Sequence, residues 1–499
     1  MVKSHSKIPV DIDAELSPKA RKFFGNLIDG YERRIAELSE SNAKLAADRA
    51  TLDFQLAKKG KLTPNNSSIP PSTQHPHGKD KPKSKQPKSA TRKKRGGQPG
   101  HTKATRSLVP TEDCDVVEVL RPHTCRNCAE ELKGDDPEPL RHQVFELPVI
   151  KPIVTEYQRH RLTCDCCGTQ TCAPLSVGVP TGQCGPRLAA FTGLLMGHFR
   201  QSKRKAAAFL GDLLNIPFSP SWTIKIQTQV SEAVAKPYEE LRSELQNQRQ
   251  LFVDESPTKQ GKQKAWLWVA VAPLFTVFAI SLNRKRESLK AFLGNYSGTI
   301  INCDRAKMYF DGKVLQWCWA HIKRDIQRLI DSHDNQAKRL GHDLMRQQRL
   351  LFEQWHLYKD GKIGWKNFRK SVAPIRTEFD SLLLRGRFSG NKILVGMCTE
   401  LYQRREWLWT FIKTQGIEPT NNAAERALRP AVIYRKLSFG TQSDSGSRYI
   451  ERILTVSETC RLQKRSAFEY LVSAMEAFFA KKPAPSLILQ IGSTNKKAA

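Results

Sequence analysis

The first clear pattern of apolar positions along the chain is a seven-residue repeat between residues 24 and 56. This spacing predicts a short coiled coil within residues 14–60. The polar Asn42 at one core position favours a parallel dimer in fixed register. An amphipathic helix that packs on its own chain is the alternative. One column of the repeat holds Phe24, Tyr31, Leu38, Leu45 and Leu52, and the other holds Ile28, Ile35, Asn42, Arg49 and Leu56.

A strand-like pattern follows in the middle of the chain. The stretch QLFVDESPTKQGKQKAWLWVAVAPLFTVFAISL, residues 250–282, has three apolar runs separated by turns, which is typical of a small antiparallel meander. RESLKAFLG then has a helical pattern, and GTIINCD, residues 298–304, predicts a buried strand that ends at Asp304.

Helical periodicity predicts two further regions. Residues 186–247 read as helices around the polar turn NIPFSPS, which suits a helix-turn-helix whose recognition helix opens with Ser221, Trp222 and Thr223. Ordinary helix packing explains this pattern equally well. Periodic segments such as NQAKRLGHDLMRQQRLLFEQW predict that residues 331–415 form an all-helical insertion.

Composition separates residues 61–107 from the regions on either side. Pro, Ser, Asn, Gln and Lys dominate this segment, so it cannot bury a core. TRKKRGGQPGH at 91–101 is interpreted as a flexible basic arm that binds DNA phosphates through charge, although a merely solvated linker is the alternative. The phosphate-binding candidates are Arg92, Lys93, Lys94 and Arg95.

The whole chain of 499 residues is strongly basic, with 81 Lys and Arg against 49 Asp and Glu. This excess favours a nucleic-acid partner. A membrane surface is the rival, but no apolar stretch approaches the roughly 18 residues that span a bilayer. The N-terminus lacks a secretory signal, so we expect a cytoplasmic protein whose twelve cysteines are metal ligands or buried thiols.

Two cysteine clusters carry a metal-binding pattern. CRNC at 125–128 and CDCCG at 164–168 each put thiols on a tight turn, so four of them can surround one structural zinc ion. Cys166 can replace Cys167 with small backbone changes. The intervening QVFELPVIKPIVTEYQRHRLTC reads as strands, which predicts a zinc ribbon over residues 108–183. The expected ligands are Cys125, Cys128, Cys164 and Cys167.

Three acidic residues far apart in the chain form a second candidate site. Asp254 lies on the first strand of the meander and Asp304 ends the buried strand. Glu425 lies on a helix that Asn421 or Asn422 can cap. Carboxylates that converge in this way bind two Mg²⁺ ions about 3.5 to 4 Å apart, which suits in-line attack on phosphorus. Mn²⁺ can take the same place.

Each acid also has an ordinary structural interpretation. Asp254 can cap a turn, and Glu255 beside it can equally be the metal ligand. Asp304 can cap the helix that follows it. Glu425 can form a surface ion pair with Arg429, four residues on, worth only about 0.3 to 0.5 kcal/mol.

Basic residues and one histidine accompany these acids. His321 and Arg324 lie on a predicted helix and can reach the acidic site or a phosphate, or simply lie on the helix surface. Arg429, Arg435 and Lys436 follow Glu425, and we expect them to contact DNA phosphates.

These blocks together resemble a known family. NNAAERALRPAVIYRKLSFGTQSDSGSRYIERILTVSETC, residues 421–460, resembles the C-terminal block of the insertion-sequence-66 family of bacterial transposases. VDES, INCD and AHIKRD resemble that family's other catalytic blocks, and the order of the segments matches over nearly the whole chain. Ser256 stands where the family usually has Thr, and DRAKMYF after Asp304 also departs from its pattern.

The resemblance implies a DDE transposase that cuts the ends of its element with Mg²⁺ and joins the freed 3′ hydroxyl to target DNA. Asp254, Asp304 and Glu425 become its catalytic triad. Its partners are the double-stranded terminal inverted repeats and target DNA at the nucleoid, a second copy or more through the coiled coil, and small accessory proteins. A catalytically inactive, zinc-containing DNA-binding repressor is the alternative.

The predicted fold is therefore a multidomain α+β protein with an RNase-H-like α/β catalytic domain, interrupted by the helical insertion. The predicted segments are 14–60 (coiled coil), 61–107 (basic linker), 108–183 (zinc ribbon), 184–247 (helical DNA-binding segment), 248–330 and 416–482 (the two parts of the catalytic core), 331–415 (insertion) and 483–499 (tail).

Overall fold

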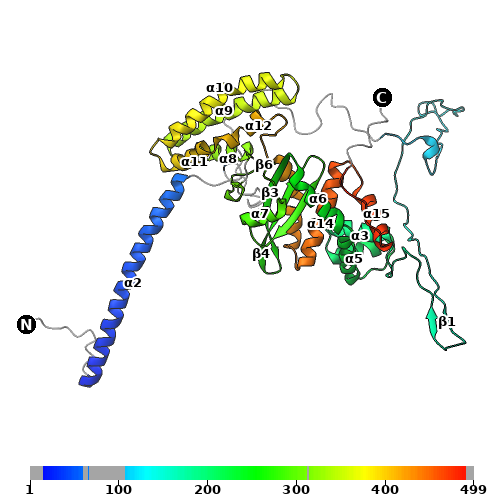
Figure 1. The fold of residues 1–499 in the computed structure, drawn as a ribbon, viewed down its shortest axis with the longest axis horizontal. Coiled ribbons are helices and arrows are strands. Elements are labelled where there is room, and N and C mark those ends of the chain that lie inside the picture. Colours follow the sequence, from blue (N-terminus) through cyan, green and yellow to red (C-terminus); the bar gives the residue numbers. More distant parts are fainter. Residues whose placement is uncertain (1–14, 60–65, 67–106, 312–313, 490–499) are drawn as a thin grey trace, which may run out of the picture. The chain divides into compact units, whose positions relative to one another are not determined.

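The computed structural model describes residues 15–59, 66, 107–311 and 314–489 (Figure 1). The basic arm with Arg92, Lys93, Lys94 and Arg95 lies outside these residues, as does most of the predicted linker. The chain divides into two units, and the larger one holds the sheet and most of the helices. The larger unit is Met1–Gln74, Glu156–Phe209 and Pro217–Ala499, and the smaller is His75–Thr155 and Leu210–Ile216.

The seven-residue repeat lies on one long helix, α2 (Pro18–Lys59). Its apolar column is open to solvent, since Tyr31 is 63% exposed and Leu45 is 62% exposed. Phe24, Ile35 and Leu38 are exposed as well. The side chains of the last column members, Leu52 and Leu56, lie outside the described part. The repeat therefore presents an exposed apolar stripe along the described side chains of α2.

The predicted meander and buried strand form one mixed five-stranded sheet, in the order β5-β4-β3-β6-β7. The three meander strands pair antiparallel, whereas β6 runs parallel to β3 and β7 runs parallel to β6. Helix α7 (Arg286–Leu293) joins β5 to β6, as predicted. The sequence did not predict β7, a short strand of four residues. The strands are β3 (Gln250–Gln260), β4 (Gln263–Val271), β5 (Thr276–Ser281), β6 (Ile300–Cys303) and β7 (Val314–Trp317).

The edge strand β5 is covered by helix α14 (Asp444–Leu462) through side-chain hydrogen bonds. Four residues advance a helix by about 6 Å, and two residues advance a strand by about 6.8 Å, so alternate N–H groups of β5 meet every fourth side chain of α14. This match satisfies the outward N–H groups that an edge strand otherwise leaves free. Thr276 N donates to Thr459 Oγ1 (3.2 Å), Phe278 N to Thr455 Oγ1 (3.0 Å) and Ile280 N to Glu451 Oε1 (2.5 Å).

Residues 186–247 are helical, as predicted. The helix that begins at Pro220 is capped by the Ser219 side chain and contains Ser221, Trp222 and Thr223 in its first turn. Thr223 is fully buried, so it cannot contact DNA. The helices are α3 (Pro186–Met196), α4 (Lys203–Leu214), α5 (Pro220–Ala233) and α6 (Ala235–Glu244).

Residues 331–415 contain only helices and turns, and each is described. Their core with α8 is aromatic: the Trp319 ring lies 5.1 Å from that of Trp409, and the Trp355 ring lies 5.7 Å from that of Phe368. Helices α9 and α10 lie side by side (Figure 1). The helices are α8 (Trp319–Ile330), α9 (Asn335–Lys359), α10 (Trp365–Arg387), α11 (Lys392–Gln403) and α12 (Thr410–Lys413).

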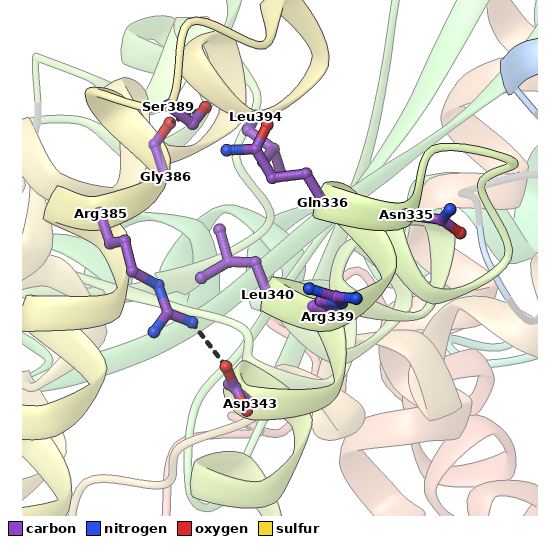
Figure 2. A pocket seen from close by; sticks show the side chains of 9 residues that line it. All are labelled: Asn335, Gln336, Arg339, Leu340, Asp343, Arg385, Gly386, Ser389 and Leu394. Atoms are coloured by element: carbon purple, nitrogen blue, oxygen red, sulfur yellow. Dashed lines mark hydrogen bonds and ion pairs between the residues drawn. The ribbon is translucent and has the colours of Figure 1, made fainter.

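An open pocket of 510 Å³ lies between α9 and α10 (Figure 2). Its acidic residue, Asp343, is paired with Arg385 across the pocket at 2.5 Å. Among the described residues, Asp343 is the one acidic residue that lines the pocket, and it is already paired, so the pocket is a poor candidate for a cation site.

The cysteine region contains less regular structure than predicted. A short hairpin, β1 (Arg161–Thr163) with β2 (Gln170–Cys172), flanks the second cysteine cluster. The prediction of strands over 143–160 is wrong, because the structure has none there. Apolar side chains of that stretch bury no core, with Val149 81% and Ile153 97% exposed, and strands without a ladder partner or a buried face do not form.

Candidate active site

Asp254 and Asp304 lie at the same edge of the sheet on neighbouring strands. In the parallel pair of β3 and β6, Phe252 is opposite Asn302. Each aspartate follows its paired residue by two positions (254 − 252 = 304 − 302 = 2), so the two carboxylates come at matching points. Burial raises the pKa of Asp254 well above its usual range, and the nearby charges of Glu255 and Asp304 raise it further. The structure therefore brings the two acids together.

Asp304 also forms a local turn. Its Oδ1 accepts a hydrogen bond from Ala306 N at 2.8 Å, just before the short helix η4 (Lys307–Tyr309). Burial raises the pKa of Asp304, while this hydrogen bond and the cation of Arg284 lower it. The capping interpretation is therefore wrong, because Ala306 occupies the N-cap of η4 and no side chain makes a cap bond there. Among the described residues, no hydrogen bond is seen to the second carboxylate oxygen of Asp304.

Glu255 has a different setting from Asp254. Arg284 Nε lies 2.7 Å from its Oε1, and the Tyr309 hydroxyl donates to its Oε2. Burial raises the pKa of Glu255 to about 7. Within the described residues Asp254 accepts one hydrogen bond, from Glu255 N at 2.9 Å. Asp254 is therefore the less committed acid of the two. Sequence reasoning missed both Arg284 and Tyr309.

The segment that precedes helix α13 (Asn422–Ser438) is tied to the strand ends. Asn302 Nδ2 donates to Glu418 O at 2.7 Å, and Asn421 Nδ2 donates to Val253 O at 2.8 Å. The expectation that Asn421 or Asn422 caps the helix is wrong for Asn421. It occupies the N-cap position, but its side chain makes no cap bond and binds the strand next to Asp254 instead.

Glu425 reaches the same site from the first turn of α13. Its Oε1 lies 3.5 Å from Arg324 Nη2 and 3.7 Å from His321 Nδ1, and its charge contributes to the raised pKa of Asp254. Its ion pair among the described residues is with Arg324 of α8, and none is with the exposed Arg429. The surface pair with Arg429 does not form.

His321 and Arg324 both face Glu425 from α8. Of the positions that the sequence left open for them, the structure therefore shows the one next to an acidic residue. Burial, together with the cations of Arg324 and Arg305, lowers the pKa of His321 to about 3. The imidazole is therefore neutral at ordinary pH. Arg305 has its own acidic partners, since it lies 2.9 Å from Asp325 Oδ2.

Cys318, immediately before α8, is a site residue that sequence reasoning did not single out. Its Sγ accepts a hydrogen bond from Asn421 N at 3.1 Å. Ligand atoms of Cys318, His321 and Glu425 all lie within 4.8 Å of one another. The spacing CxxH at the start of an amphipathic helix was the available signal, since it puts both side chains on one face.

Basic side chains, together with Glu353, line a hollow near the start of α13. This hollow of 410 Å³ lies against the N-terminal ends of α8 and α13, and Lys323, Arg349 and His356 line it. On α13, Arg429 and Lys436 are exposed, whereas Arg435 is half-buried and its pKa is lowered by burial.

The two cysteine clusters form tight turns with the same hydrogen bonds. Gly168 N donates to Cys164 O (2.8 Å) and Ala129 N to Cys125 O (2.9 Å). Backbone N–H groups lower the pKa of Cys125, and contacts with Thr169 and Cys164 lower that of Cys167. The Cys167 thiol also donates to Thr169 Oγ1 at 3.3 Å. The knuckles belong to different units, so a shared zinc stays a prediction.

No helix in the described ranges is both long and apolar enough to cross a membrane.

Comparison with known proteins adds a family match. Residues 185–449, which are 265 of the 499, match the Transposase IS66 family. The uncharacterized protein y4qI of Sinorhizobium fredii is 24% identical over 274 residues, which cover 48% of this chain and 49% of that protein. The chain thus spans about half the length of this curated relative.

Proposed function

The chain belongs to the IS66 family of transposases, and from that premise we propose that it is a DNA transposase that cuts the ends of its element and transfers them to target DNA. The observation that carries this proposal is the matching position of Asp254 and Asp304 at one sheet edge, with Glu425 near enough for its charge to raise the pKa of Asp254. The inactive repressor is not favoured, because an inert scaffold has no reason to keep buried acids together at a cost in stability.

The strand order supports an RNase-H-like assignment for the catalytic core. Three antiparallel strands are extended by two parallel ones, and both aspartates come from the central part of the sheet. The family match covers this sheet, the helical insertion and the helix with Glu425.

The acidic set fits hard divalent cations such as Mg²⁺ or Mn²⁺. Its donors are carboxylate oxygens, and each aspartate's ionised form is opposed by burial, so a cation would relieve an existing cost. We infer that Asp254, Asp304 and Glu425 together bind two such cations. Such ions activate an attacking water or 3′ hydroxyl and stabilise the leaving oxygen on phosphorus.

The surrounding residues keep these acids in place. Asn421 holds the start of α13 against β3, Ala306 N orients Asp304, and Arg284 with Tyr309 fixes the strand at Glu255. Arg324 balances part of the charge of Glu425. Lys323 and Arg349, in the adjoining hollow, are placed to bind phosphates of a DNA end.

Two other parts of the chain support this assignment. The exposed apolar column of α2 is suited to pairing with a second copy, which would bring two catalytic cores to two element ends. The knuckles with Cys125, Cys128, Cys164 and Cys167 are suited to a structural zinc ion, since their turns already lower thiol pKa values.

The test is cleavage of labelled DNA that carries the terminal inverted repeat, in Mg²⁺. Asp304→Asn should lower the cleavage rate by roughly 10³-fold or more while binding of the same DNA is kept. Asp360→Asn, at the exposed C-terminal end of α9, is the matched control and should cleave normally. Equal cleavage by the Asp304→Asn and wild-type proteins, or a wild type that binds ends and never cuts them, would contradict the proposal.

A further inference from the structure

The strongest site outside the proposed magnesium centre is a mixed set of donors on α8 and α13. The thiol of Cys318, the imidazole of His321 and the carboxylate of Glu425 have ligand atoms within 4.8 Å of one another. Cys318 and His321 are three residues apart, and His321 N donates to Cys318 O at 3.0 Å, which turns both side chains to the same side. Two helices far apart in the chain thus supply one sulfur, one nitrogen and one oxygen.

The imidazole is directed into this set without a protein partner. Among the described residues, His321 Nδ1 is buried and makes no hydrogen bond. It lies 3.7 Å from Glu425 Oε1, which is too long for a hydrogen bond and close to the spacing of two ligands on one metal ion. A buried nitrogen acceptor or donor left unpaired costs free energy, and metal coordination removes that cost.

The thiol is also prepared for coordination. Cys318 is fully buried, and its Sγ accepts the N–H of Asn421 at 3.1 Å. Burial raises the pKa of Cys318 to about 11, and the N–H of Asn421 offsets part of this rise, so an arriving metal ion has to displace the proton. The same Asn421 holds α13 against β3, so the position of Glu425 relative to the thiol is set by a single residue.

We propose that Cys318, His321 and Glu425 bind one zinc-class divalent cation, and that this cation competes with the hard-cation centre for Glu425. Sulfur and imidazole ligands select borderline-soft ions over Mg²⁺, and three protein ligands leave a fourth position for water. The competition, though not the binding, rests on the proposed function.

One neighbour opposes the ion. Arg324 Nη2 lies 3.5 Å from the same Glu425 oxygen and must give it up when a cation binds. Glu425 is 38% exposed and has a second oxygen, so the guanidinium can move to that oxygen or to solvent. Binding is therefore expected to be weaker than at a four-cysteine site and to be reversible.

The first test measures binding in the full-length protein, with Co²⁺ as a spectroscopic probe for zinc. Wild-type protein should bind one equivalent more than Cys318→Ser, with a correspondingly stronger thiolate-to-cobalt absorption, because the knuckle cysteines absorb equally in both proteins. Cys398→Ser removes another buried thiol, on α11, and should bind as the wild type does. His321→Asn provides a second variant if Cys318→Ser fails to fold. Equal stoichiometry in wild type and a folded variant overturns the site.

The second test measures DNA cleavage at fixed Mg²⁺ with increasing Zn²⁺. Half-inhibition of Cys318→Ser or His321→Asn should need at least ~10-fold more Zn²⁺ than the wild type, because loss of even an outer partner of a ligand costs 10- to 100-fold in metal affinity. Bound zinc without inhibition overturns the competition. If the wild type cleaves no DNA, the proposed function fails and the cobalt stoichiometry still decides the site.

Discussion

The acidic site and the cysteine knuckles prepare their ligands for cations in opposite ways. Asp254 and Asp304 are buried next to each other, so ionisation is opposed and their pKa values rise. Cys125 and Cys167 lie on open turns, where hydrogen bonds lower the thiol pKa. In the acidic site, the ionised carboxylates are destabilised until a cation binds. In the knuckles, hydrogen bonds favour the thiolate, which is the form that binds a metal ion, before any ion is present. The difference teaches that the proposed magnesium site and the proposed zinc site would carry their electrostatic costs in different states.

The largest expected effect comes from removing the charge of one buried aspartate. Asp254→Asn should abolish DNA cleavage, by roughly 10³-fold or more, and yet raise the melting temperature in EDTA, because one of the opposing charges is gone. Calorimetry in EDTA and in Mg²⁺ measures both states. If Asp254→Asn melts at a lower temperature than the wild type in EDTA, burial of the acids does not carry the expected electrostatic cost.

The next effect is a pH dependence of the metal-free protein. Burial raises the pKa of Glu255 from 4.5 to about 7, so the folded state binds more protons than the unfolded state between these values. Stability should therefore fall as pH rises through this window, by roughly 3 kcal/mol from this group. Denaturant unfolding in EDTA at pH 5 and pH 8 measures it, and Glu255→Gln should flatten the profile. A stability that increases over this range would be evidence against a stored cost.

A smaller effect tests whether the hydrogen bonds from α14 stabilise the edge strand β5. Thr455→Val should leave the N–H of Phe278 unpaired beneath α14 and lower the free energy of unfolding by about 1 to 3 kcal/mol. Thr377→Val, which loses only an exposed bond within α10, is the control. Denaturant unfolding compares them. Equal values for the two variants would mean that α14 covers the edge by packing alone.

The smallest effect on the sheet should come from the knuckles. Cys128→Ser should lose bound zinc, measured by metal analysis, while the main unfolding transition of the sheet shifts by less than about 0.5 kcal/mol. The reason is that Cys128 and the sheet belong to different units. Hydrogen exchange then identifies which residues lose protection. A large shift in the sheet would show that the two regions are coupled.

Much of this protein follows from local sequence. The meander over residues 250–282 pairs strands that are neighbours in the sequence, and the helical insertion and the cysteine turns depend on side-chain period and on short-range hydrogen bonds. Their patterns are therefore present in the chain itself. Asp304 could also be singled out, because a carboxylate that ends a buried strand is costly without a partner. The resemblance of the surrounding motifs to the family then joined Asp254 and Glu425 to it.

Tertiary structure decided the rest. Several features join segments that lie far apart in the chain. They are the pairing of strand β7, the hydrogen bonds from Arg284 and Tyr309 to Glu255, and the side-chain hydrogen bonds between α14 and β5. The same is true of the bonds from Asn421, which bring Glu425 to the strands and to Cys318. Such contacts have no period to read, since they depend on which distant surfaces bury one another. The apolar stretch 143–160 shows the converse, because strand-forming residues remain unpaired where no partner surface covers them.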